Sequence, residues 1–149
     1  MRIRGVPGYR AASLAAVEAF LAPPRLMRLG VTEPDGTPLV HPVWYTWQDE
    51  QFLVHMGTQS SKRTAIASQP IVYFTVDDAR PGVVFGVRGK AHATLELDAT
   101  RIRDVVQAQC DRYAEARDSA THRFLFGMVE RGELLLAVLR PHSLATWGL

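Results

Sequence analysis

The sequence predicts a mainly β protein, an antiparallel barrel decorated by helices, and three observations carry this prediction. Apolar and polar residues alternate at the two-residue period of β-strands through most of residues 26–97, and strand-like segments return after residue 132. Short segments rich in Gly, Pro and Asp separate neighbouring strand segments. The expected order is helix, three strands, helix, two strands, helix, two strands, which lacks the regular alternation of a parallel β/α fold. We therefore expect a single domain over residues 1–149.

The first expected helix begins at Ser13, whose side chain can cap it, and ends before Pro23. Its apolar residues fall on one face of the helix: Leu14, Val17, Phe20 and Leu21. Three strands separated by turn residues follow it, at residues 26–33, 39–48 and 51–57. We expect these three consecutive strands to pair as an antiparallel meander.

A short helix over residues 60–69 is expected next, because Ser60 can cap it and Pro70 ends it. Two further strands follow this helix, at residues 71–78 and 83–97. The second of them is long, and Gly86 or Gly89 can let it bend, as strands do when a small barrel closes.

The last expected helix is capped by Asp98 and ends at residues 116–121. One face of this helix is apolar, with Ile102, Val105, Val106, Cys110 and Tyr113. The segment 133–149 then reads as two strands broken at Pro141.

The composition is that of an ordinary soluble domain, with 47% hydrophobic and 21% charged residues. The apolar runs are too short to cross a bilayer, and no apolar segment follows the N-terminal charges, so we expect no membrane partner and a cytoplasmic location. The 17 basic and 15 acidic residues are interspersed, which argues against a nucleic-acid partner.

Neither cysteine nor histidine indicates a metal site. The single cysteine, Cys110, excludes an intramolecular disulfide and a thiolate zinc cage, and its place on an apolar helix face favours a buried thiol. The histidines show no close ligand spacing, and we expect no metal: they are His41, His55, His92, His122 and His142. His41 is a candidate for orienting a substrate, although a structural role is the more common one.

Two cations follow the cap of the short helix, Lys62 and Arg63. A helix N-terminus already carries a partial positive charge and unpaired N–H groups, so cations are unfavourable there and anions favourable. Together with the hydroxyl of Ser61, these groups predict a phosphate site at the helix start. The alternative is that both cations simply face water.

A neighbouring strand carries large aromatic side chains. Strand alternation places Trp44 on one face and Val43 and Tyr45 on the other. Core packing is the usual role of such residues. Beside a phosphate site, the same strand is also a candidate wall for a flat ring, and both interpretations stay open.

Segments 35–47, 51–78 and 83–95 together resemble, in order and spacing, the pyridoxamine-phosphate-oxidase-like FMN-binding split-barrel family, which includes flavin and deazaflavin oxidoreductases. The resemblance covers most of residues 26–97, and segment 140–149 is similar to the usual last strand of that family. It implies an antiparallel six-stranded split β-barrel that binds FMN.

The resemblance also implies roles for particular residues. A serine and basic residues after the third strand hold the flavin phosphate in that family, and these positions fall here on Ser61, Lys62 and Arg63. The second strand lines the ring with backbone groups, which falls on Val43, Trp44 and Tyr45. The next strand end approaches the ring edge and the ribityl chain with Met56, Gly57 and Thr58, and Gly57 would allow close backbone approach.

The family generally forms homodimers with the cofactor at the subunit interface. Trp147 in the last strand is therefore expected either to reach the partner's site or to pack within its own subunit. No motif for a protein nucleophile occurs, which suits chemistry that resides in a cofactor, so we assign no catalytic residue.

The leading expectation is an FMN-binding oxidoreductase that transfers a hydride between the flavin and a small organic substrate. An F420-dependent reductase of the same fold is an alternative, and the longer basic groove it needs could draw on Arg25, Arg88 and Lys90. A further alternative is a non-catalytic protein that binds or carries flavin or haem.

Overall fold

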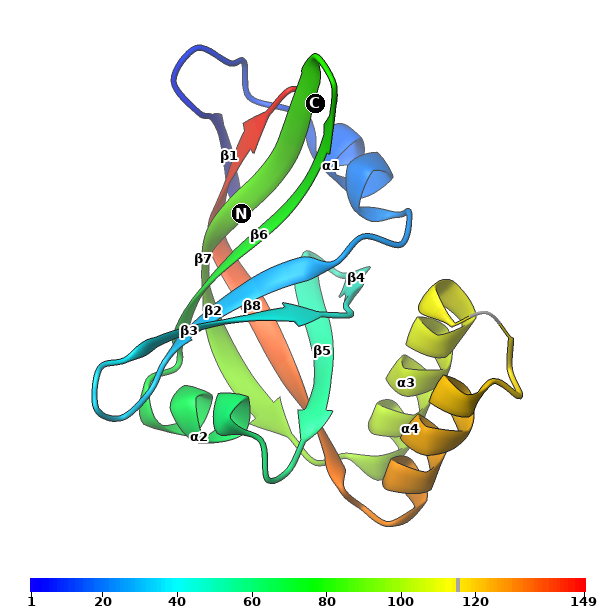
Figure 1. Ribbon diagram of the computed structural model, residues 1–149. Coiled ribbons are helices and arrows are strands. Elements are labelled where there is room, and N and C mark those ends of the chain that lie inside the picture. Colours follow the sequence, from blue (N-terminus) through cyan, green and yellow to red (C-terminus); the bar gives the residue numbers. More distant parts are fainter. Residues whose placement is uncertain (115) are drawn as a thin grey trace.

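Three long antiparallel strands form the middle of an eight-stranded sheet in the computed structural model, which describes residues 1–114 and 116–149 (Figure 1). These strands are β6 (Ile71–Arg80), β7 (Val83–Glu96) and β8 (Leu134–Trp147). The others are β1 (Arg2–Gly5), β2 (Met27–Thr32), β3 (Pro38–Val43), β4 (Thr46–Gln48) and β5 (Gln51–Gly57). The strand order is β3-β2-β6-β7-β8-β5-β4, and β1 pairs with β8 in parallel.

Four helices accompany the sheet within residues 1–114 and 116–149: α1 (Leu14–Leu21), α2 (Ser61–Ser68), α3 (Ala99–Tyr113) and α4 (Ala120–Glu130). The caps expected from the sequence form, because the side chains of Ser13, Ser60 and Asp98 each accept a hydrogen bond from a backbone N–H of the first turn. Helices α3 and α4 lie side by side next to β5 (Figure 1). Among the described residues, no helix is both long and apolar enough to span a membrane.

The mainly β, antiparallel class is confirmed, but the expected count of six strands is wrong. Strand β1 was not expected, because its four residues, Arg2–Gly5, are partly or fully exposed and lack a clear apolar alternation. The segment expected as one strand over residues 39–48 is interrupted at Trp44 and Tyr45 and forms β3 and β4. These two differences add two strands to the seven segments expected from the sequence, and the continuous β8 described below removes one, which gives eight.

The expected three-strand meander is also wrong. β2 pairs with β3 and β4 pairs with β5, but β3 and β4 lie at opposite ends of the strand order. Because the chain leaves one edge of the sheet after Val43 and joins the other edge at Thr46, the two edges lie near each other at this crossing. The cavity described below lies beside it.

Two further expectations need correction. β8 continues through Pro141, where the pairing with β7 shifts by one residue between Lys90 and Ala91, so the tail is one bulged strand and not two. Gly86 and Gly89 are not the place of that shift, but a Cβ on Gly86 would lie 2.5 Å from the Trp147 ring. Helix α4 was missed because residues 116–121 were interpreted only as the end of the preceding helix.

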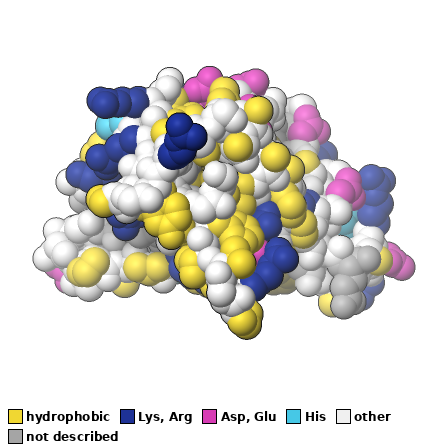
Figure 2. Space-filling view, turned by 90° about the horizontal axis from the view of Figure 1, so that it is seen from above, with side chains coloured by type: hydrophobic (Ala, Val, Ile, Leu, Met, Phe, Trp, Pro, Cys, Tyr) yellow, Lys and Arg dark blue, Asp and Glu magenta, His cyan; other side chains and the backbone are white. Residues whose placement is uncertain are grey.

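The interior contains two groups of apolar side chains. One fills the barrel and includes the fully buried rings of Tyr45, Phe52 and Phe74. The other lies between the sheet and the α3–α4 pair and includes Leu53 and Val106. On the surface seen in Figure 2, hydrophobic side chains are interspersed with charged side chains of both signs.

Candidate functional site

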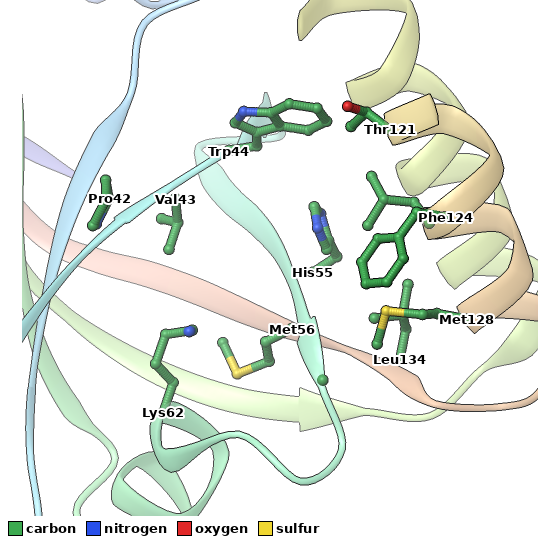
Figure 3. Close-up of a pocket in the computed structure, with 12 residues that line it drawn as sticks. Pro42, Val43, Trp44, His55, Met56, Lys62, Thr121, Phe124, Met128 and Leu134 are labelled. Atoms are coloured by element: carbon green, nitrogen blue, oxygen red, sulfur yellow. The ribbon is translucent and has the colours of Figure 1, made fainter. Parts of the chain in front are cut away.

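A cavity of about 450 Å³ lies between the end of β3, strand β5, the start of α2 and helix α4 (Figure 3). Small-molecule sites usually have volumes of about 300–1,000 Å³. Its walls are mostly apolar, formed by Pro42, Val43, Trp44, Met56, Phe124, Leu125, Met128 and Leu134, with His55, Gly57, Lys62 and Thr121 completing the lining. A flat, largely apolar ligand suits such walls.

The indole of Trp44 is held in place by its aromatic neighbours. It stacks on Tyr113 with ring centroids 4.9 Å apart and planes 10° apart, and the Tyr113 hydroxyl donates to the Arg25 carbonyl at 2.8 Å. A further wall comes from α4, where Phe124 lines the cavity and remains 64% exposed. An exposed phenyl group at the mouth of a cavity is available for contact with a ligand.

Of the described residues that line the cavity, Lys62 alone carries a full charge at neutral pH, and its ammonium group points into the cavity (Figure 3). It lies in the first turn of α2, which contains no acidic residue. Ser60 Oγ accepts from the Arg63 N–H at 3.3 Å, while the N–H groups of Ser61 and Lys62 have no acceptor within the helix. Positive charge therefore gathers at one end of the cavity.

The other residues predicted near this helix lie just outside the cavity lining. Ser61 and Arg63 are exposed, and Thr58 is half-buried in the connection that follows β5. Gly57 does line the cavity, and a Cβ there would meet only ordinary contacts, at 3.9 Å from Met128 Cε and 4.0 Å from the Glu133 carbonyl. Since its φ is not positive either, the fold itself does not require glycine at this position.

The expected alternation along the aromatic segment is wrong, because β3 ends at Val43 and the chain then turns. Val43 and Trp44 both line the cavity, whereas the Tyr45 side chain lies in the barrel core. The Tyr45 hydroxyl donates to the Leu21 carbonyl at 3.2 Å, and burial raises the pKa of this phenol to about 12.

Trp147 does not line this cavity. Its ring packs over Gly86 and lines a separate hollow between β2, β6 and β7, together with Val40, Tyr73 and Arg88. The structure thus brings together Val43, Trp44, Met56, Gly57 and Lys62, and leaves Tyr45 and Trp147 apart from them.

The sequence interpretation missed His55 and the whole contribution of α4. In the sequence, His55 follows the strand alternation like any partly buried residue. Only the structure shows that a hydrogen-bond partner fixes its ring. His55 Nδ1 forms a hydrogen bond with Oε1 of Gln109, a completely buried side chain of α3. The apolar positions of α4 could have been found from their helical spacing after Ser119.

Two histidines near Lys62 are held in the neutral form. Burial lowers the pKa of His55, and the Lys62 charge lowers it further, while the hydrogen bond to Gln109 opposes both effects. Burial and the Lys62 charge also lower the pKa of His41, with Glu33 acting in the opposite direction. His41 Nε2 is buried and has no hydrogen-bond partner among the described residues.

Acid is expected to destabilise the fold through these two imidazoles. Their ordinary pKa of 6.5 applies to the unfolded chain, and their pKa in the folded chain lies lower. The free energy of unfolding is therefore fully retained above pH 6.5 and declines as the pH falls towards the folded pKa. Thermal melts at about pH 7.5 and 5.5 measure this loss. The variant Lys62→Met should lose less stability than wild type, because both pKa values then rise towards 6.5 although burial still lowers them. An equal loss would exclude the Lys62 charge as a cause.

No cluster of three or more His, Cys, Asp or Glu side chains that could hold a metal ion occurs in residues 1–114 and 116–149. The thiol of Cys110 is buried, and burial raises its pKa, which disfavours the reactive thiolate. The groups that the site offers to a ligand are therefore an apolar slot, one cation beside a helix N-terminus and one neutral imidazole.

Comparisons with known proteins extend these observations. A family model described as pyridoxamine 5'-phosphate oxidase matches residues 13–136. No curated protein sequence matches the chain.

Several solved structures have a similar fold. A conserved hypothetical protein from Mycobacterium tuberculosis is 18% identical with a TM-score of 0.81, covering 97% of this chain and 89% of its own. An F420 reductase is 24% identical with a TM-score of 0.66, and the match covers 93% of this chain and 98% of the reductase chain. A haem storage protein from Vibrio cholerae is 14% identical with a TM-score of 0.68, and the match covers 97% of this chain and 94% of the storage protein's chain. At these identities the similarity concerns the fold alone.

Proposed function

Because the chain belongs to the pyridoxamine 5'-phosphate oxidase family, we propose that it is an FMN-binding oxidoreductase that transfers a hydride between the flavin and a small organic substrate. The isoalloxazine ring would occupy the cavity between β5 and α4, and the phosphate would lie at the start of α2. The observation that carries this proposal is the position of Lys62, a cation pointing into a mostly apolar cavity beside free helix N–H groups.

The residues present fit a phosphorylated flavin. Trp44, Phe124 and Met128 offer apolar surface for a flat ring, and the absence of a side chain at Gly57 leaves room that the packing of the fold does not need. Lys62 and the N–H groups of the first turn of α2 supply the charge and the donors that a phosphate requires. Ser61 and Arg63 stand beside them and are the proposed outer contacts.

The protein's own part in the reaction is to bind, orient and exclude water. FMN supplies the hydride chemistry when bound. The apolar walls formed by α4 keep water from the ring, and Lys62 fixes the phosphate end, so the position of the ring is set by groups that take no part in bond breaking.

We also propose a homodimer with the cofactor at the subunit interface. Large apolar side chains are exposed around the hollow that contains Trp147, with Val40 68% and Tyr73 46% exposed. A second copy would cover them and bring Trp147 towards the partner's site. Sedimentation velocity tests this point, and a monomeric wild-type protein would contradict it.

A comparison of FMN with riboflavin tests the proposed site. Riboflavin has the same ring but no phosphate, so both should bind and FMN should bind at least tenfold more tightly, since hydrogen bonds to a charged group contribute about 1.5–3 kcal/mol. Titration of cofactor-free protein, followed by quenching of flavin fluorescence, measures both affinities. Equal affinities would contradict the phosphate site, and binding of neither would contradict the proposed function.

A deazaflavin, F420, is the second candidate, and a cationic groove favours it. Arg4, Arg88, Lys90 and His142 line a second hollow over β1, β7 and β8 that an anionic tail could occupy. Arg25 does not contribute there, because its guanidinium pairs with Asp78 at 3.5 Å and lies over the Phe20 ring. Tighter binding of F420 than of FMN would decide for this candidate.

A further inference from the structure

A buried amide fixes the hydrogen-bonding state of the cavity wall. Gln109 on α3 is completely buried, and both ends of its amide are engaged. Its Nε2 donates to the Leu53 carbonyl at 2.9 Å, and its Oε1 meets Nδ1 of His55. Because a backbone carbonyl can only accept, the nitrogen of the amide must face Leu53, and the oxygen must face His55.

This orientation decides where the imidazole proton lies. An amide oxygen can only accept, so His55 Nδ1 must carry a hydrogen and donate it. In the neutral imidazole, Nε2 is then left without a hydrogen and can only accept. Burial and the nearby Lys62 charge, which both lower the pKa of His55, favour this neutral form.

The accepting nitrogen belongs to a residue that lines the cavity. The His55 ring projects into it from β5 (Figure 3), at 6.1 Å from the Trp44 ring and among the apolar side chains of Met128 and Leu134. In the described part of the chain, no protein group donates to His55 Nε2. A fixed acceptor in an apolar wall is satisfied best by a donor on the ligand.

We propose that His55 Nε2 accepts a hydrogen bond from a ring N–H of the bound cofactor, and that Gln109 is the positioning residue that holds the imidazole in the required tautomer. The inference rests on the proposed function. An oxidised flavin ring has one N–H group, at N3 of its pyrimidine edge, so that edge faces β5.

The tautomer can be measured without any cofactor. In protein labelled with 15N-histidine, long-range 15N–1H spectra at about pH 7.5 should show His55 protonated on Nδ1 and bare on Nε2. In Gln109→Leu, which removes the accepting oxygen, the Nε2-protonated form should appear. A wild-type imidazole that carries its proton on Nε2, or both protons, would overturn the inference.

The ring contact is tested by comparing FMN with N3-methyl-FMN, which lacks the N–H donor. Wild type should bind the methylated compound at least about tenfold more weakly, because the acceptor, covered by the ligand, then loses its partner. In His55→Leu the two affinities should become nearly equal, and Gln109→Leu should fall between. The matched control is His92→Leu, an exposed histidine on β7 that should keep the full discrimination.

The outcomes separate this inference from the proposed function. Binding of FMN by wild type with no discrimination against N3-methyl-FMN would overturn the role of His55 and leave the flavin site standing. Failure of both flavins to bind would overturn the proposed function and this inference together. A haem absorption band that changes in His55→Leu would mean that Nε2 ligates iron and would overturn the hydrogen bond proposed here.

Discussion

The Lys62→Glu variant is expected to bind FMN about 100-fold more weakly than wild type, with nearly unchanged affinity for riboflavin. Lys62 points into the cavity and supplies the positive charge that a phosphate needs there. Loss of a charged hydrogen bond costs about 1.5–3 kcal/mol, or roughly 10- to 150-fold in affinity, and the new carboxylate adds repulsion. Fluorescence titration with each flavin measures both effects.

Unfolding cannot account for this expected loss. An acidic residue in the first turn of a helix is favourable, so Lys62→Glu should keep or slightly raise the thermal stability. Arg10→Glu provides a matched charge reversal at an exposed loop residue and should leave FMN binding unchanged. Wild-type FMN affinity in Lys62→Glu, or an equal loss for riboflavin, would remove Lys62 from the phosphate site.

The Phe52→Ala variant is expected to lose about 3–5 kcal/mol of stability. Phe52 is fully buried in the barrel, with ring centroids of Trp47, Phe74 and Tyr45 at 4.5, 4.8 and 5.3 Å. Truncation would leave a cavity that these rings cannot fill without moving. At about 2–4 °C per kcal/mol for a chain of this size, the melting temperature should fall by roughly 6–20 °C.

Phe124→Ala is the matched control, because the chemical change is the same but the side chain is 64% exposed. Its stability should change by less than about 0.5 kcal/mol. Its affinity for both flavins should fall, since Phe124 forms part of the cavity wall. Equal destabilisation by the two substitutions would contradict the assignment of Phe52 to the core and Phe124 to the site.

The parts of the fold that follow from local chemistry were predictable from the sequence. The cap at Ser60, the strand over residues 51–57 and the cation of α2 each depend on a few adjacent residues. For this reason the sequence placed Lys62 at a helix start, and the structure shows it lining a cavity.

The parts that depend on distant contacts were not predictable in this way. The turn at Trp44 is stabilised by stacking on Tyr113 of α3, a contact between residues far apart in the chain. Gln109, the hydrogen-bond partner of His55, lies 54 positions further along the sequence, and the strand pattern does not predict this contact. β1 pairs with β8 across nearly the whole chain and carries no periodic signal of its own.

The central claim is that a phosphorylated flavin binds in the cavity beside Lys62. Its most direct test is the visible absorption spectrum of freshly purified protein. Mass spectrometry then identifies the chromophore released on denaturation. The account predicts a flavin spectrum and the mass of FMN. Released haem would contradict it, as would a colourless protein that binds neither FMN nor F420 on titration.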